Sequence, residues 1–221
     1  MVTSQNFMDD SILCYSNCDF MSFVNLDLIK EIDSLWEPVY PYLAKQIHEL
    51  YGRQDGNILE MGPFCGMIFT LQRMKIGRSF LIATFPSGMG DFFRQEAKKQ
   101  KFGEKIKTIE TDSSLTGIKE NKIDLAIFRG AFFFPSLFKV NFSAIHRVLK
   151  PKGIAFIGGG FGKLTPDKVI KDIGKRSRDL NLQIGKIEVN EDQLRQDIEK
   201  SNVKGKVEII SEGGLWVLMR K

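Results

Sequence analysis

The sequence predicts an α/β protein in which a mostly parallel sheet is closed by an antiparallel hairpin at the C-terminus. From residue 57 onward, short apolar runs typical of buried strands alternate with longer segments of helical periodicity, which is the pattern of βαβ units. Near the C-terminus, two further apolar runs are separated only by Ser211–Gly214. That link is long enough for a hairpin but too short for a parallel crossover.

Each expected strand is a short apolar run bounded by polar residues or glycine. These runs lie at residues 57–61, 79–84, 105–110, 123–128 and 153–157, and those of the hairpin at 206–210 and 215–219. Because helices separate the first five runs, we expect parallel neighbours with right-handed crossovers. The last strand should run antiparallel to its predecessor.

The expected helices share apolar residues at three- and four-residue steps. They span Met67–Met74, Gly90–Phe102 and Leu137–Leu149. After the third, Lys150-Pro151-Lys152-Gly153 predicts a helix stop and a turn, since proline cannot continue a helix and glycine favours a turn. Residues 20–51 are expected to be largely helical, with breaks at Pro38 and Pro41, and they precede the first strand.

The composition indicates one globular unit with a small addition. A chain of 221 residues, 43% hydrophobic and 27% charged, is long and apolar enough to bury a core. We expect a helical cap or lid at residues 1–50 and the main domain at 51–221. The net charge is +5, but the basic runs at 98–101 and 163–178 hold no aromatic residues on which bases could stack. They indicate solvated helix faces, so nucleic acid is not an expected partner.

Three cysteines, Cys14, Cys18 and Cys65, form an odd set without a familiar disulfide spacing, which predicts a reducing compartment. With only His48 and His146 beside them, they do not form a zinc-binding pattern, and we expect no metal site. No apolar run approaches the ~20 residues of a membrane span. The first ten residues are acidic without an apolar segment, unlike a signal peptide. We therefore expect a cytoplasmic protein without a membrane partner.

The most informative segment is Ile58–Gly66, in which a strand ends in an acidic residue, turns through glycines and enters a helix. Glycine is needed where the backbone approaches a ligand closely or adopts positive φ. The carboxyl end of the first strand is also where α/β sheets bind ligands. Taken alone, a tight strand–helix turn without a ligand would have the same pattern.

Further motifs follow in order along the chain. Glu60, Gly62 and Gly66 resemble motif I of the class I S-adenosylmethionine-dependent methyltransferases. Asp112, after the third strand, resembles the acidic residue that contacts the adenine amine in that family. Lys122–Gly130 resembles the family's fourth strand, and His146–Gly153 resembles its helix ending in Leu-Lys-Pro-Gly-Gly. The C-terminal hairpin is also typical of the family.

This resemblance covers about residues 40–221 and implies a Rossmann-like, doubly wound sheet. It implies S-adenosylmethionine as cofactor and methyl transfer to an acceptor. Within the family, Ile157–Gly162 resembles a subgroup of small-molecule-type or uncharacterised prokaryotic methyltransferases, and a small-molecule acceptor is therefore expected. The resemblance identifies no catalytic residue, and it leaves open whether the protein forms a homodimer. The implied cofactor-binding residues are Glu60, Gly62, Phe64, Gly66, Thr84, Asp112, Ser113 and Arg129.

The sequence departs from the family pattern at two positions. Phe64 replaces the middle glycine of motif I, and Thr84 stands where an acidic residue usually holds both ribose hydroxyls. A threonine hydroxyl offers one neutral acceptor contact where a carboxylate makes two charge-assisted bonds. A weakened site is therefore an alternative, in which the chain binds an adenosyl ligand without catalysis. A thiol-based metal or metalloid site is the other.

Residues around the acceptor are expected from two segments. Tyr40, Tyr42 and His48 of the N-terminal cap are candidates to shape acceptor choice. Phe132–Phe134 follow the fourth strand, where they form either an apolar wall for the substrate or ordinary loop packing. Arg129, at the end of that strand, could meet an anionic group.

Overall fold

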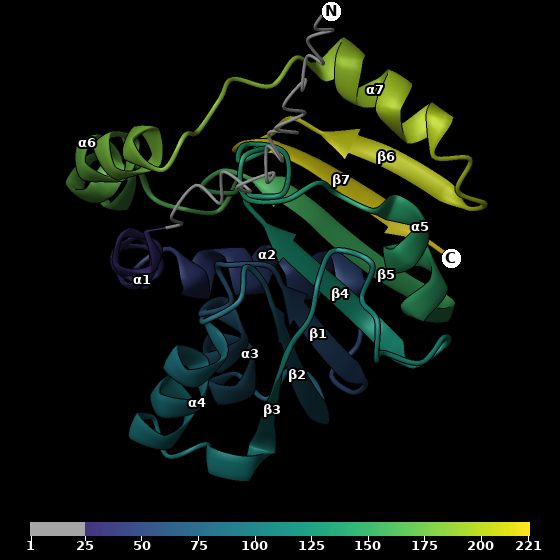
Figure 1. The fold of residues 1–221 in the computed structure, drawn as a ribbon, viewed down its shortest axis with the longest axis horizontal. Coiled ribbons are helices and arrows are strands. Elements are labelled where there is room, and N and C mark those ends of the chain that lie inside the picture. The colour runs from purple at the N-terminus through teal and green to yellow at the C-terminus, as the bar shows by residue number, and fades with distance from the viewer. Residues whose placement is uncertain (1–24) are drawn as a thin grey trace, which may run out of the picture.

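The computed structural model describes residues 25–221, so Cys14 and Cys18 lie outside the described residues. Seven strands form one sheet in the order β3-β2-β1-β4-β5-β7-β6 (Figure 1). The strands are β1 (Asn57–Met61), β2 (Ser79–Thr84), β3 (Ile106–Glu110), β4 (Ile123–Arg129), β5 (Leu149–Gly159), β6 (Lys206–Ile210) and β7 (Leu215–Arg220).

The parallel and antiparallel parts of the sheet agree with the sequence prediction. Strands β1 to β5 pair in parallel, whereas β7 pairs antiparallel with both β5 and β6. The predicted hairpin is therefore confirmed, and β7 lies between β5 and β6.

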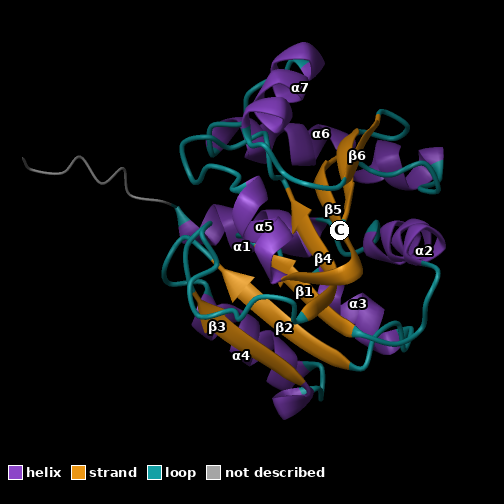
Figure 2. Ribbon diagram, turned by 90° about the vertical axis from the view of Figure 1, so that its right-hand side faces the viewer, coloured by secondary structure: helices purple, strands orange, loops and turns teal. Residues whose placement is uncertain are grey.

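Helices cover both faces of the sheet (Figure 2). They are α1 (Leu26–Leu35), α2 (Tyr40–Tyr51), α3 (Met67–Arg73), α4 (Gly90–Lys99), α5 (Phe142–Val148), α6 (Asp167–Gln183) and α7 (Glu191–Lys200), with a 3-10 turn at Gly103–Lys105. Alternate residues of each central strand enter separate cores. Ile58, for example, belongs to the core that holds buried residues of α1, α2, α3, α4 and α6, whereas Leu59 belongs to the core that holds those of α5 and α7. This is the doubly wound arrangement that was expected.

Several element boundaries differ from the prediction. Helix α5 begins five residues later than expected, because the Asn141 side chain caps it by accepting from the Ala144 N–H at 2.9 Å. Helix α4 ends at Lys99, and the backbone soon turns through Lys101 at φ 62°. We had expected a helix break at Pro41, and this prediction is wrong. Pro41 lies in the first turn of α2, where its missing N–H has no intrahelical partner to lose.

The segment Lys150–Gly153 stops α5 as predicted but forms no separate turn. It belongs to β5, whose pairing with β4 shifts between Ile123 and Leu125. Gly153 is required there because an added Cβ would lie 2.9 Å from the Ile123 carbonyl oxygen. The strand therefore begins with an irregular stretch.

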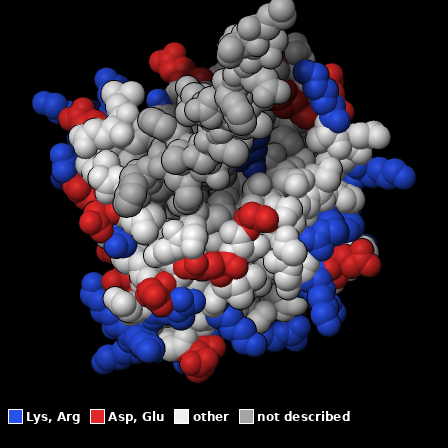
Figure 3. Space-filling view, viewed as in Figure 1, with Lys and Arg blue, Asp and Glu red and all other residues white. Residues whose placement is uncertain are grey.

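The N-terminal helices share the core of the main body. Helix α1 packs against α6, and α2 packs against α3. The division at residue 50 and the lid role stay predictions. None of the helices within residues 25–221 has the length and hydropathy that a bilayer span requires. On the face in Figure 3, Lys and Arg side chains are interspersed with Asp and Glu.

Candidate active site

The glycine loop joins β1 to α3 and is buried from Gly62 to Gly66. Gly62 has φ 96°, and its N–H donates to the Ala83 carbonyl of β2 at 3.0 Å. An added Cβ at Gly62 would lie 2.6 Å from the ring of Phe128. Positive φ and this aromatic neighbour together explain why the turn needs glycine.

Glu60 points from β1 into a buried ionic cluster at the carboxyl end of the sheet. Its Oε2 accepts from the Ile68 N–H in the first turn of α3 at 2.7 Å. Its Oε1 accepts from Nε of Arg129 at 3.3 Å. Arg129 ends β4, so neighbouring strands β1 and β4 bring the two side chains together.

Asp33 of α1 completes this cluster, and the sequence analysis had missed it. Its Oδ1 accepts from Nη2 of Arg129 at 2.8 Å and from the Gly66 N–H at 3.1 Å. The Tyr40 hydroxyl also donates to this oxygen at 2.7 Å. We call Asp33, Tyr40, Glu60 and Arg129 the ionic cluster.

Arg129 is bound to the glycine loop and to the aromatic residues around it. Its Nη2 also donates to the Phe64 carbonyl at 3.1 Å, and its guanidinium carbon lies 4.3 Å from the centre of the Tyr40 ring. The same Tyr40 ring explains the glycine at position 66, because an added Cβ there would lie 2.9 Å from the ring. The cluster therefore fixes the position of the loop relative to α1.

Two carboxyl groups share one guanidinium in the ionic cluster, and all are buried. Burial raises the pKa of Glu60 to about 8, although Arg129 and the Ile68 N–H oppose the rise. Burial likewise raises the pKa of Asp33 against the attraction of Arg129. Burial disfavours the charge of Arg129, but Tyr40, Glu60 and Asp33 hold its pKa above the ordinary value. One guanidinium neutralises one carboxylate, so the cluster favours a protonated second carboxyl group.

The remaining predicted residues lie at the ends of β2 and β3, and within residues 25–221 no hydrogen bond or ion pair joins them to the ionic cluster. Thr84 is fully buried, and its Oγ1 has no hydrogen-bond partner within the described part of the chain. Asp112 is exposed and accepts from the Ser114 N–H at 2.8 Å. Hydrogen bonds from Ser114 lower the pKa of Asp112. Ser113 lines a separate open cavity of about 800 Å³.

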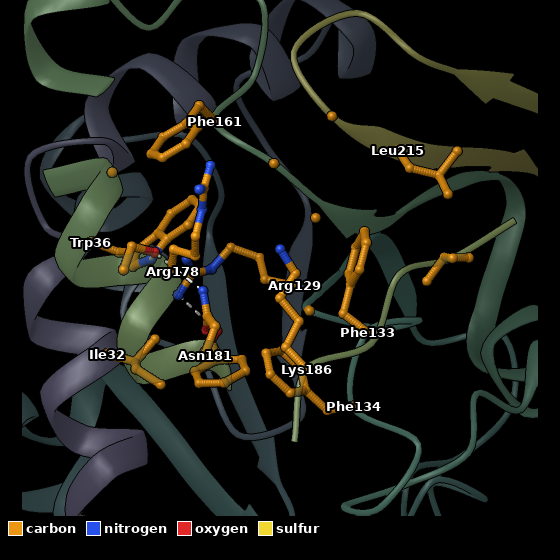
Figure 4. A pocket seen from close by; sticks show the side chains of 18 of the residues that line it. Ile32, Trp36, Arg129, Phe133, Phe134, Phe161, Arg178, Asn181, Lys186 and Leu215 are labelled. Carbon is orange, nitrogen blue, oxygen red and sulfur yellow. Dashed lines mark hydrogen bonds between the residues drawn. The ribbon is translucent and has the colours of Figure 1, made fainter. Parts of the chain in front are cut away.

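A cavity of about 490 Å³, which we call the aromatic cavity, opens beside the ionic cluster (Figure 4). Phe64 and Arg129 line it, and so do Phe133 and Phe134. Of the predicted aromatic run, Phe132 instead packs on Phe142, with ring centres 6.1 Å apart. The apolar-wall interpretation therefore fits two of the three residues.

Of the three cap residues that were expected to shape acceptor choice, only one lies at the site. Tyr40 belongs to the ionic cluster, whereas neither Tyr42 nor His48 lines the aromatic cavity. Asp33 and Arg129 are 96 residues apart in sequence. Asp33 lies in an amphipathic helix that also carries Asp27, Lys30 and Glu31, so nothing in the sequence singled it out.

Cys65 is the one cysteine that the structure describes as free, and it is fully buried. Its Sγ lies 3.2 Å from the Gly62 carbonyl oxygen. Burial, together with Glu60 and Asp33, raises the pKa of this thiol well above its usual range. A group held neutral in this way is a poor thiolate ligand.

Both the sequence and the fold of this chain are similar to those of known methyltransferases. Residues 62–157 match the sequence model of the methyltransferase domain family. A proposed S-adenosyl-L-methionine-dependent methyltransferase from Methanococcus maripaludis has a similar structure, with TM-score 0.73 and 21% identity, covering 100% of this chain and 97% of that one. No curated protein sequence matches the chain.

Two further solved structures are similar. A SAM-dependent methyltransferase from Aquifex aeolicus gives TM-score 0.61 at 13% identity, covering 89% of this chain and 97% of that one. Geranyl diphosphate C-methyltransferase from Streptomyces coelicolor, solved with Mg²⁺, geranyl diphosphate and S-adenosyl-L-homocysteine, gives TM-score 0.52 at 12% identity, covering 80% and 77%.

The strand order, the antiparallel β7 and the glycine loop after β1 define a Rossmann-like methyltransferase fold. Residues 62–157 match the methyltransferase domain, and the fold of the chain is that of solved S-adenosylmethionine-dependent methyltransferases.

Proposed function

We propose that this protein binds S-adenosylmethionine and transfers its methyl group to a small-molecule acceptor. The observation that carries the proposal is the junction of β1, β4 and α1. There the glycine loop of a methyltransferase domain meets a buried cluster with more acidic than basic groups, beside a cavity large enough for a small molecule.

The residues of the junction fit this cofactor in charge. Asp33 and Glu60 outnumber Arg129, so the cluster can accept one more cation, and the amino-acid end of the cofactor carries an ammonium group. Its carboxylate suits the guanidinium of Arg129. At the end of β2, the buried Thr84 hydroxyl lacks a partner within the described residues and could bind a ribose hydroxyl.

In this proposal the chain contributes binding and alignment. Asp33 and Glu60 hold the ammonium group, and Arg129 orients the carboxylate. Aromatic walls such as Phe133 exclude water from the reacting atoms. The cofactor supplies an electrophilic methyl group on a sulfonium. Holding the two reactants in line can contribute ~7–11 kcal/mol to lowering the barrier.

A non-catalytic binding protein is the second candidate, and Thr84 is the observation that favours it. The neutral Thr84 hydroxyl stands where the family usually has a carboxylate, which would weaken the grip on the ribose. Turnover separates the two functions. The experiment is calorimetric titration with S-adenosylmethionine, followed by detection of S-adenosylhomocysteine after incubation with a panel of small acceptors. Binding without product from any acceptor class would favour the second candidate.

A further inference from the structure

The walls of the aromatic cavity are mainly apolar and rigid. Trp36 of α1 stacks on Phe161, with ring centres 4.8 Å apart and planes within 8°. Trp216 of β7 stacks on Phe156 of β5, with ring centres 4.2 Å apart. Phe133 forms a further wall from the loop after β4 (Figure 4). Rings held by such stacking offer a preformed surface to an apolar ligand.

The charged residues that line this cavity within the described part of the chain are all positive. They are Arg129, Arg178 and Lys186, with no Asp or Glu among them. Arg129 is neutralised within the ionic cluster. Arg178 and Lys186 are exposed, and within residues 25–221 neither takes part in an ion pair. The Lys186 ammonium lies 5.2 Å from the centre of the Phe133 ring, so it stands over an aromatic wall of the cavity.

A buried donor without a partner gives independent evidence for a ligand. The indole Nε1 of Trp216 has no hydrogen-bond acceptor within the described residues, although the side chain is only 1% exposed. The nitrogen lies beside Gly214, which also lines the cavity. By contrast, the indole N–H of Trp36 donates to Ser177 Oγ at 2.9 Å. An unpaired buried donor is unfavourable unless a ligand accepts from it.

We propose that the aromatic cavity binds a small amphipathic anion, namely an apolar ring or branched hydrocarbon carrying a carboxylate or phosphate group. The apolar part packs between Trp36, Phe133 and Phe161. The anionic group meets Arg178 and Lys186 at the exposed side of the cavity, and the Trp216 N–H donates to an oxygen of the ligand. This deepens the proposed function and rests on it, since the ligand is then the methyl acceptor.

The cavity also limits the reacting atom of the acceptor. Within residues 25–221, no His, Asp or Glu lines the cavity, so an acceptor atom that is already unprotonated fits these walls without a carboxylate or imidazole base. A lone pair on that atom forms the bond to the methyl carbon while the carbon–sulfur bond breaks, and the bonding electrons stay on sulfur as a neutral thioether.

The test is calorimetric titration of the full chain with three probes of similar shape: 2-naphthoate, 1-naphthyl phosphate and the neutral 2-naphthalenemethanol. We expect at least one anion to bind about tenfold or more tightly than the alcohol, as charge-assisted hydrogen bonds imply. The comparison of the two anions identifies the preferred headgroup. Equal affinity for all three probes, or binding of none, would overturn the proposal.

Variants locate the anion. Arg178→Gln and Lys186→Gln should each weaken binding of the preferred anion by about tenfold and leave binding of the alcohol unchanged. Arg176→Gln and Lys175→Gln are matched controls, because both residues are exposed on α6 and neither lines the cavity. Trp216→Phe removes the indole N–H while an aromatic ring stays against Phe156, so it should weaken binding of the probes. Its melting temperature is measured alongside, because the smaller ring leaves a cavity in the core. Equal losses in the Arg178 and Arg176 variants would refute the assignment.

Titration of the same samples with S-adenosylmethionine distinguishes this proposal from the proposed function. Anion binding with this mutational pattern but no cofactor binding would support the cavity assignment and remove the methyltransferase proposal. Cofactor binding without discrimination between the anions and the alcohol would keep the methyltransferase and overturn the assignment of an anionic acceptor.

Discussion

Replacing Glu60 by Gln should remove a pH-dependent loss of stability. The Glu60 side chain is completely buried and shares Arg129 with Asp33. Its pKa is about 8 in the folded protein, against 4.5 for an ordinary glutamate. Between these values the unfolded chain ionises Glu60 more readily than the folded protein does. Stability from this group is therefore full below pH 4.5 and is lost as the pH rises towards 8.

The size of the effect follows from the same two values. One bound proton corresponds to about 1.4 kcal/mol of unfolding free energy per pH unit. Over the interval from pH 4.5 to 8, the loss from Glu60 reaches about 5 kcal/mol. Gln has the same shape and no charge, so its variant lacks this slope. The Gln amide can accept from Arg129 but loses the acceptor for the Ile68 N–H, so the pH dependence is more informative than stability at one pH.

The assay is urea denaturation of wild type and Glu60→Gln at half-unit steps between pH 5 and 8.5. The difference between their unfolding free energies should change by several kcal/mol in favour of Gln as the pH rises. Glu104→Gln, in the exposed 3-10 turn, is the control and should parallel wild type. Parallel curves for wild type and Glu60→Gln would show that Glu60 is ionised across this range and that the account of the ionic cluster is wrong.

Three further substitutions test the surroundings of the glycine loop. Gly62→Ala should lower the unfolding free energy by about 2–4 kcal/mol, because it adds backbone strain and overpacks against Phe128. The loss should be smaller in a Phe128→Leu background, and equal losses in both backgrounds would contradict the contact. Thr84→Val should raise stability by about 1 kcal/mol, because it removes a buried hydroxyl without a described partner; destabilisation in a melting experiment would mean that the hydroxyl is paired. Asp112→Ala should weaken binding of S-adenosylmethionine in a calorimetric titration while leaving the fold intact, and unchanged affinity would remove Asp112 from the cofactor site.

The sheet was predictable because its signals are local. Each strand is a contiguous apolar run, and the short link at Ser211–Gly214 by itself requires an antiparallel pair. Boundaries were harder to predict, since they depend on single side chains. The cap at Asn141 starts α5, and the close approach of Gly153 to Ile123 makes Lys150–Gly153 part of β5.

The candidate site was predictable only where a motif marks it. Glu60, Gly62 and Gly66 lie within one short segment, and Arg129 ends the neighbouring strand. Asp33 is brought to them by the packing of α1, which no spacing in the sequence encodes. Thr84, Asp112, Ser113 and the other residues of the cofactor set stay predictions until binding is measured.

Calorimetric titration of the purified full chain with S-adenosylmethionine at neutral pH tests the central claim most directly. The account predicts a 1:1 complex with a dissociation constant in the micromolar range or below, and Glu60→Gln and Asp33→Asn should weaken it more than the Glu104→Gln control does. No heat and no shift in melting temperature at millimolar cofactor would contradict the claim that the junction of β1, β4 and α1 is a cofactor site.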